Sequence, residues 1–240
     1  MEVKVIASGS KGNMYVVTGD NESLIIECGV KIDTFIKAIG GLNAVGCLVS
    51  HEHNDHKRCA EKASNQYGIP LYMSQGTLDG ISKLDNANIV KSHDTFKVGT
   101  EFQVYAFDTE HDVSEPLGFL IYHTPSGKQV LFITDSYYSK YVFNDIDLIM
   151  VECNYNDDVL QRNIDKGNID PSRYKRTLKS HFGLNNVIKF LNSCKLTNTK
   201  KIMLLHLSDG NSHEQSMIDE VVRATGKQTI AASPGVSINI

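Results

Sequence analysis

The segment VSHEHNDHK, residues 49–57, is the most informative part of this sequence. It places three histidines and one aspartate within six positions, directly after an apolar run. Imidazole is the commonest side-chain metal ligand, and a neighbouring carboxylate suits a borderline-hard divalent ion. A chance cluster of solvated polar residues is the alternative interpretation. Other parts of the chain have to distinguish a metal site from such a cluster.

The composition indicates an ordinary globular protein. The 240 residues are 41% hydrophobic and 22% charged, and this length fits one large domain or two small ones; we expect one domain over residues 1–240. The sequence has no apolar stretch of membrane-spanning length, and its first ten residues resemble a strand rather than a signal peptide. Five widely spaced cysteines favour reduced thiols over a disulfide framework, and therefore a cytoplasmic protein without a membrane partner. A net charge of −4 gives no global sign of nucleic-acid binding.

Short β-branched runs alternate with segments of helical periodicity, which predicts a layered α/β protein. Gly, Asn and Asp turns separate the first runs, as in a meander. The strand that precedes the histidine cluster is expected at 44–50. The other expected strands cover 3–7, 14–19, 23–28, 101–108, 117–123, 129–134, 146–151 and 201–206, and the expected helices cover 32–40, 184–193 and 213–225.

Candidate metal ligands follow several of these strands. His51 and His53 alternate by two, so both can point the same way in an extended chain, whereas Asp55 and His56 begin the next helix. This spacing can serve two ions rather than one. Three further candidates each come at the end of a predicted strand: His111, Asp135 and His206. A single strand-end Asp is usually a turn or helix cap, but the combination with the histidine cluster favours ligands.

These residues resemble the metallo-β-lactamase superfamily of dinuclear hydrolases, and in particular its YycJ/WalJ-like branch. The resemblance extends over nearly the whole chain. Besides HxHxDH at 51–56, the matching segments are SGSKGN (8–13), HD followed by EPLGF (111–119), ITDSY (133–137), ECN (152–154), HFGLN (181–185) and LLHLSDGNS (204–212). The resemblance implies an αβ/βα sandwich of two mixed β-sheets flanked by helices.

The resemblance also implies a ligand set. One ion would be held by His51, His53 and His111, a second by Asp55, His56 and His206, and Asp135 would bridge them. The cofactors would be two divalent transition-metal ions (Zn, Mn or Fe), which activate a hydroxide and hold a phosphate. Asp55 would also orient the hydroxide. His181 would stabilise the transition state or leaving group, although a histidine that packs at a helix N-terminus is the alternative.

Two further segments allow more than one interpretation. Residues 8–13 could form a phosphate-binding loop or a plain hairpin turn. The branch usually continues ECN-like segments with His-Asp, whereas this chain has Tyr155 and Asn156 there. That departure puts substrate choice in doubt.

Residues 161–179 are the most basic segment of the chain. They contain Arg162, Lys166, Arg173, Lys175, Arg176 and Lys179 against two aspartates. Most charge runs are solvated faces. This segment leads directly into His181, so Arg173, Lys175 and Arg176 are expected to contact a polyanionic backbone.

Three functions are compatible with these features. The resemblance implies a metal-dependent phosphodiester hydrolase, and most specifically a DNA exonuclease with nucleic acid as its substrate. A hydrolase of a small substrate, such as a cyclic nucleotide or lactone, is an alternative on the same fold. A non-catalytic binding module is the third hypothesis, and the complete ligand set argues against it. The native metal, DNA against RNA, the polarity of digestion, the oligomeric state and the pathway stay open.

Overall fold

The computed structural model describes residues 1–81, 84, 86–208 and 210–240. The chain divides into two compact units. The first unit contains residues 1–108, 113–129 and 233–240, and the second contains 109–112 and 130–232. The expectation that the whole chain is one domain stays a prediction.

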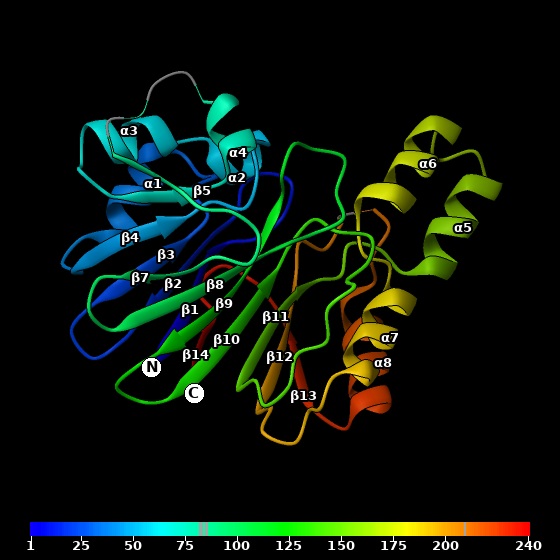
Figure 1. The fold of residues 1–240 in the computed structure, drawn as a ribbon. Coiled ribbons are helices and arrows are strands. Elements are labelled where there is room, and N and C mark those ends of the chain that lie inside the picture. The colour runs from blue at the N-terminus through cyan, green and yellow to red at the C-terminus, as the bar shows by residue number, and fades with distance from the viewer. Residues whose placement is uncertain (82–83, 85, 209) are drawn as a thin grey trace. The chain divides into compact units, whose positions relative to one another are not determined.

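The strands form two mixed sheets of seven strands each (Figure 1). In the first sheet the order is β14-β1-β2-β3-β4-β5-β6, and in the second it is β13-β12-β11-β10-β9-β8-β7. The strands are β1 (Glu2–Ala7), β2 (Met14–Thr18), β3 (Ser23–Ile26), β4 (Ala44–Leu48), β5 (Leu71–Met73), β6 (Ala87–Ile89), β7 (Thr95–Val98), β8 (Phe102–Asp108), β9 (Leu117–His123), β10 (Lys128–Ile133), β11 (Leu148–Glu152), β12 (Lys201–Leu205), β13 (Gln228–Ala231) and β14 (Ser237–Asn239).

Helices flank both sheets, as predicted for the α/β class. They are α1 (Ile32–Ile39), α2 (Asn54–Lys57), α3 (Ala60–Asn65), α4 (Gln75–Asp79), α5 (Asp157–Asp165), α6 (Pro171–Ser180), α7 (Leu184–Ser193) and α8 (Glu214–Thr225). Among the described residues, none of these helices has the length and apolar character needed to cross a bilayer.

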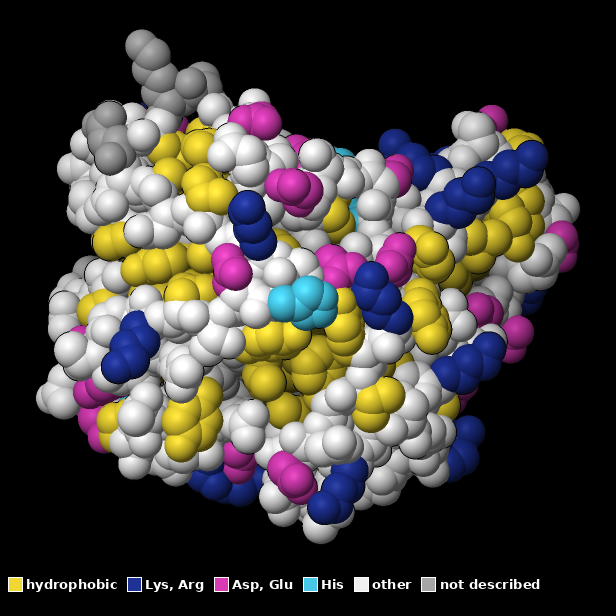
Figure 2. Space-filling model, viewed as in Figure 1, with side chains coloured by type: hydrophobic (Ala, Val, Ile, Leu, Met, Phe, Trp, Pro, Cys, Tyr) yellow, Lys and Arg dark blue, Asp and Glu magenta, His cyan; other side chains and the backbone are white. Residues whose placement is uncertain are grey.

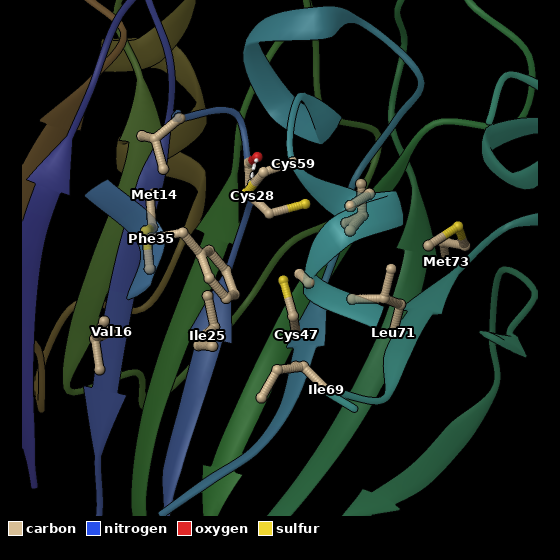
Figure 3. Packing of buried hydrophobic residues seen from close by; sticks show 14 residues of the cluster. Met14, Val16, Ile25, Cys28, Phe35, Cys47, Cys59, Ile69, Leu71 and Met73 are labelled. Carbon is tan, nitrogen blue, oxygen red and sulfur yellow. Dashed lines mark hydrogen bonds between the residues drawn. The ribbon is translucent and has the colours of Figure 1, made fainter. Parts of the chain in front are cut away.

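The core of the first unit lies between its sheet and the helices α1 and α3 (Figure 3). Strands β2 to β5 each contribute buried apolar side chains, and Phe35 of α1 inserts among them with no exposed surface. Cys28, Cys47 and Cys59 lie in the same cluster. All five cysteines of the chain are buried and free, as their spacing predicted.

In the second unit, strands β10 to β13 run parallel to one another. Strand β11 is buried along its whole length, as expected for parallel strands with both faces covered. Its register pairs Val151 with Ile133 on one side and with Leu204 on the other. The carboxyl ends of the three strands therefore meet at one edge, where Asp135 follows β10 by two residues and His206 follows β12 directly.

The loop that joins β1 to β2 is tied to the histidine motif of the same unit. Asn13 donates its backbone N–H to the Asp55 carbonyl at 2.8 Å, and Gly29 donates to the Asn13 carbonyl at 3.0 Å. Gly29 lies so close to the motif that a Cβ atom there would be 1.6 Å from the Asp55 oxygen. Segment 8–13 thus acts at least as a structural support of the motif, and a phosphate contact by its backbone stays a prediction.

The twelve elements expected from the sequence are all present, with ends shifted by at most two residues. The sequence reasoning missed the three- and four-residue strands β5, β6, β7, β13 and β14 and the helices α2 to α6, apart from a helix start at Asp55. A run of three residues is too short to reveal a period.

Gly29→Ala should destabilise the protein by at least about 3 kcal/mol, because the added methyl group overlaps the backbone at Asp55 and His56. Denaturant unfolding would measure this change. Gly40→Ala is the matched control, since Gly40 has φ −56° and a Cβ atom there makes only ordinary contacts. The control should stay within about 1 kcal/mol of the native protein. Equal stability of the two variants would contradict this account of Gly29.

Candidate metal centre

The first histidines of the motif lie in an extended segment between β4 and α2. Ser50 Oγ lies 2.9 Å from His51 Nδ1, which fixes one ring nitrogen. His51 Nε2 then lies 3.1 Å from His53 Nδ1. Two nitrogens bound tetrahedrally to one zinc ion at about 2.0–2.1 Å would be about 3.3 Å apart. The pair therefore has the spacing of two ligands of one ion.

Asp55 and His56 open the short helix α2, as the sequence predicted. The Asp55 carboxylate, about a quarter exposed, lies 3.5 Å from His56 Nε2. On the other side of the ring, His56 Nδ1 lies 3.4 Å from Oε2 of the buried Glu27. A carboxylate behind an imidazole fixes the orientation of the ring and makes it a more basic ligand. Glu27 thus orients His56 toward Asp55.

Glu27 lies inside the core and has no exposed surface. Burial raises the pKa of Glu27, whereas the neighbouring His56 and hydrogen bonds from Ser50 oppose that rise. The Ser50 N–H donates to Glu27 Oε1 at 3.2 Å. Glu27 also has φ +64°, a left-handed conformation that is unusual for this residue type. Such strain is typical of positions that serve a site.

Four potential ligands converge within the second unit. Donor atoms of Asp135, Glu152, His181 and His206 all lie within 4.8 Å of one another. Asp135 and His206 also adopt left-handed conformations, with φ +32° and +53°. The register of the parallel strands and these two turns together bring the four side chains to one point.

Glu152 is the centre of this group and has no exposed surface. Its Oε2 accepts hydrogen bonds from the backbone N–H groups of Ser136 (3.0 Å) and Phe182 (3.1 Å). Its Oε1 lies 2.6 Å from His181 Nδ1. Through these three contacts, Glu152 positions His181 and the backbone at Ser136 and Phe182.

His181 has an unusual ionisation equilibrium. Burial opposes its protonation, but the charges of Glu152 and Asp135 and the hydrogen bond to Glu152 outweigh burial and raise its pKa to about 9. In the metal-free protein the ring is therefore an imidazolium at neutral pH. Bound divalent cations nearby would act in the opposite direction.

His111 approaches Asp135 from the short segment 109–112. Its Nδ1 donates to the carbonyl oxygen of Ser180 at 2.9 Å. Ser180 is the last residue of α6. This bond leaves Nε2 as the nitrogen closer to the carboxylate, 3.8 Å from Asp135 Oδ2. The arrangement is that of a metal-binding imidazole whose second nitrogen is anchored to the backbone.

His206 is fixed by the ECN segment. The side-chain amide of Asn154 donates to the His206 carbonyl at 3.1 Å and lies 3.1 Å from His206 Nδ1. The same histidine lies 3.9 Å from Asp135 Oδ1. Asp209, which belongs to the matching segment 204–212, lies outside the described residues.

Tyr155 and Asn156, where the chain departs from the branch pattern, have structural surroundings. Tyr155 is buried against Leu160 and Ile169, and its ring would overlap a Cβ atom at position 183. Asn156 caps α5 by accepting from the N–H groups of residues 158 and 159. Both residues therefore anchor the helices that carry the basic segment.

The predicted substrate-binding residues lie together on α6. Arg173, Lys175 and Arg176 are all exposed, and none of them forms an ion pair with a described residue. On the face drawn in Figure 2, Lys and Arg side chains gather over this helix. The helix ends where His181 begins, and the His181 N–H donates to the Thr177 carbonyl at 3.1 Å. The basic side chains of α6 thus lie in the sequence just before His181, which belongs to the group of potential ligands formed by Asp135, Glu152, His181 and His206.

The donor chemistry of both units fits a divalent transition metal. Among the described residues the groups consist of imidazole nitrogens and carboxylate oxygens and contain no thiol, and such mixed N/O sets suit Zn²⁺, Mn²⁺ or Fe. The ligand set expected from the sequence stays a prediction, and sequence reasoning did not single out Glu27 and Glu152. Their signal is the repeated pattern of an apolar strand that ends in Glu-Cys, IIEC at 25–28 and MVEC at 150–153.

Comparisons with known proteins agree on the fold. The family model described as "Beta-lactamase superfamily domain" matches residues 37–207. The exodeoxyribonuclease YycJ of Bacillus anthracis is 28% identical over 231 residues, which cover 90% of this chain and 85% of that protein. The exodeoxyribonuclease WalJ of Streptococcus pneumoniae is 24% identical over 92% of this chain and 88% of its own. The crystal structure of the metallo-β-lactamase fold protein YhfI from Bacillus subtilis superposes with a TM-score of 0.74, with 17% identity and 99% of each chain covered. The expected fold class is confirmed.

Glu152→Gln should lower the pKa of His181 in chelator-treated protein from about 9 toward or below the ordinary value of 6.5. The neutral amide removes the charge that favours the imidazolium, so the opposing effect of burial prevails. NMR titration of the imidazole would measure the shift. The control is Asp112→Asn, because Asp112 makes a smaller electrostatic contribution than Glu152 and its removal should lower the pKa less. A larger shift in the control would contradict the central position of Glu152.

Proposed function

Because the chain belongs to the β-lactamase superfamily domain family, we propose that it is a metal-dependent phosphodiester hydrolase, and specifically a DNA exonuclease. The observation that carries the hydrolase assignment is the convergence of Asp135, His181 and His206 around the buried Glu152. The names of the relatives at 28% and 24% identity support DNA as the substrate.

We propose that seven residues hold two ions. One ion would be bound by the three histidines 51, 53 and 111, the other by Asp55, His56 and His206, with Asp135 between them. When bound, two divalent ions supply an acidified water and hold the phosphate oxygens during in-line attack. The ring orientations imposed by Ser50, Glu27 and Asn154 support these assignments.

Asp55 and His181 would take part in proton transfer and charge stabilisation. The partly exposed Asp55 carboxylate can accept a hydrogen bond from the attacking water and so orient it. His181 can donate a hydrogen bond to the developing charge on the leaving oxygen. Its contact with Glu152 keeps the ring oriented for this hydrogen bond.

The basic face of α6 would bind the phosphate backbone. The helix has ten residues and is therefore about 15 Å long. Duplex DNA carries one charge per about 1.7 Å of its axis, so several phosphates can face such a helix. Arg173, Lys175 and Arg176 would thus neutralise phosphates on a strand that enters beside His181.

Hydrolysis of a small substrate is the second candidate. A lactone carries no charge, so an exposed cationic helix would not contribute to binding it, whereas a cyclic nucleotide has one phosphate to offer. A panel of end-labelled single- and double-stranded DNA and RNA, tested with metal-reconstituted protein, separates a nuclease from either alternative. Exclusive cleavage of a small phosphodiester would overturn the DNA assignment.

The proposal also includes organisation and location. We propose that residues 1–240 act as a single catalytic domain. Five buried free cysteines suit a reducing compartment, which supports the cytoplasm.

Asp135→Asn should abolish hydrolysis and lose the second ion first, because a neutral amide cannot offset the repulsion between two cations.

Asp55→Asn should retain more metal and yet lose rate, since the main role of Asp55 is to orient water. Elemental analysis of protein purified without chelator should give a ratio near two for the native chain. A folded native protein that never holds more than about one ion would exclude the dinuclear centre, and near-native turnover of both variants would exclude the ligand assignment.

Replacing Arg173, Lys175 and Arg176 together by Ala should weaken DNA binding and flatten its dependence on salt. Each neutralised phosphate contributes about 0.9 to the slope of log K against log salt for duplex DNA, so three contacts account for a change of about 2.7. Hydrolysis of a small chromogenic phosphodiester should be unchanged. Equal loss of both activities would make the segment structural, and loss of neither would make it a solvated face.

A further inference from the structure

The segment that follows Asp135 exposes an unusual set of large side chains. Tyr137 is 39% exposed, and Tyr138 and Val142 are each 55% exposed. Single exposed apolar side chains are ordinary, but three within six residues, next to a ligand group, indicate a contact surface.

This segment forms one wall of a cleft of about 350 Å³ in the second unit. That volume is at the lower end of small-molecule sites. The cleft combines two aromatic rings, an amide and two ammonium groups, and its lining includes Tyr138, Lys140, Val142, Asn186, Lys189 and Phe190.

The wall of the cleft is held in place by hydrogen bonds. Ser136 Oγ donates to the Tyr138 carbonyl at 2.7 Å, and the Tyr137 N–H donates to the Glu110 carbonyl at 3.0 Å. The Asn186 side chain of α7 donates to the Tyr137 carbonyl at 3.2 Å. A backbone fixed in this way presents the Tyr138 ring without an ordering cost on binding.

The cleft is also close to the ligand group. Tyr138 follows Asp135 by three residues, and three residues of extended chain span at most about 11 Å between Cα atoms. Tyr138 and Asp135 are thus close enough along the chain to contact neighbouring parts of one bound strand.

We propose that this cleft takes an unstacked base of single-stranded DNA, which stacks on the Tyr138 ring. Lys140 and Lys189 would contact the phosphates that flank this base. Sequence-tolerant binding of single strands combines aromatic platforms with cationic groups in this manner. The inference rests on the proposed function, and it specifies single-stranded or frayed DNA ends as the form that the site accepts.

The first test measures binding of fluorescent single-stranded oligonucleotides to the metal-loaded protein. Tyr138→Ala should weaken binding about 5- to 150-fold, the range found when a stacking ring is removed, whereas Tyr138→Phe should bind within about 3-fold of the native chain. Binding of a blunt duplex should stay unchanged. Tyr67→Ala is the matched control, because Tyr67 is 47% exposed on the first unit and should have no effect.

A second set of oligonucleotides, each with one abasic position, identifies the stacked base. One abasic position should weaken binding by the native chain as much as Tyr138→Ala does, and the variant should lose nothing further on that oligonucleotide. Additive losses, or equal losses on single strands and blunt duplex, would overturn the inference. An altered sedimentation coefficient of Tyr138→Ala with unchanged DNA binding would assign the cleft to a protein contact and overturn it as well.

The outcome is separable from that of the proposed function. A native chain that binds single strands through Tyr138 but hydrolyses neither DNA nor a chromogenic phosphodiester would refute the hydrolase and leave the cleft assignment standing. If the native chain degrades DNA, and neither the Tyr138→Ala substitution nor an abasic position changes binding, only the cleft assignment is refuted.

Discussion

The central constraint on this protein is a carboxylate without solvent contact, Glu152, at the end of a buried strand. Removing such a charge from water costs several kcal/mol unless hydrogen bonds replace the lost hydration. Two backbone N–H groups and one imidazole supply these bonds. They connect the turn after β10, the end of α6 and the strand β11. The positions of Asp135 and His181 are therefore consequences of how one buried charge is satisfied.

The first unit applies the same physical solution. Glu27 ends a buried strand, accepts from the Ser50 N–H and lies behind His56. In both units the carboxylate contacts a histidine of the candidate metal centre, His56 or His181, and a buried cysteine follows it in the sequence. An acid in this place fixes a ring and supplies negative charge near a cation, and a well-packed apolar residue could do neither. Loss of a metal would leave these charges less compensated, so metal binding and folding are expected to be coupled.

The sequence predicted the parts of the site that follow from strand ends. Strong apolar runs define where β4, β10 and β12 stop, and His51, Asp135 and His206 follow these ends within three residues. The roles of Glu27 and Glu152 could not be predicted in this way, because a strand-end carboxylate is equally common as a turn residue. The left-handed conformations at Asp135 and His206 depend on tertiary contacts, which overrule the local preference of these residues. Helices α5 and α6 were missed since their sequences are too polar to show an apolar period; Tyr155 and the residues around it hold them in place.

Two elements of the second unit reach the same ligand group and offer a strand different chemistry. The helix α6 ends at His181 and carries cations, whose attraction for phosphate weakens as salt increases. The segment that starts at Asp135 carries aromatic rings, whose stacking with a base is far less sensitive to salt because neither partner of the contact has to exchange counterions. In the proposed nuclease, affinity and the choice between paired and unpaired strands would therefore depend on different side chains. In a chain with a net charge of −4, the cations of α6 would supply most of the attraction for phosphate, and the Tyr138 ring would distinguish unpaired from paired bases.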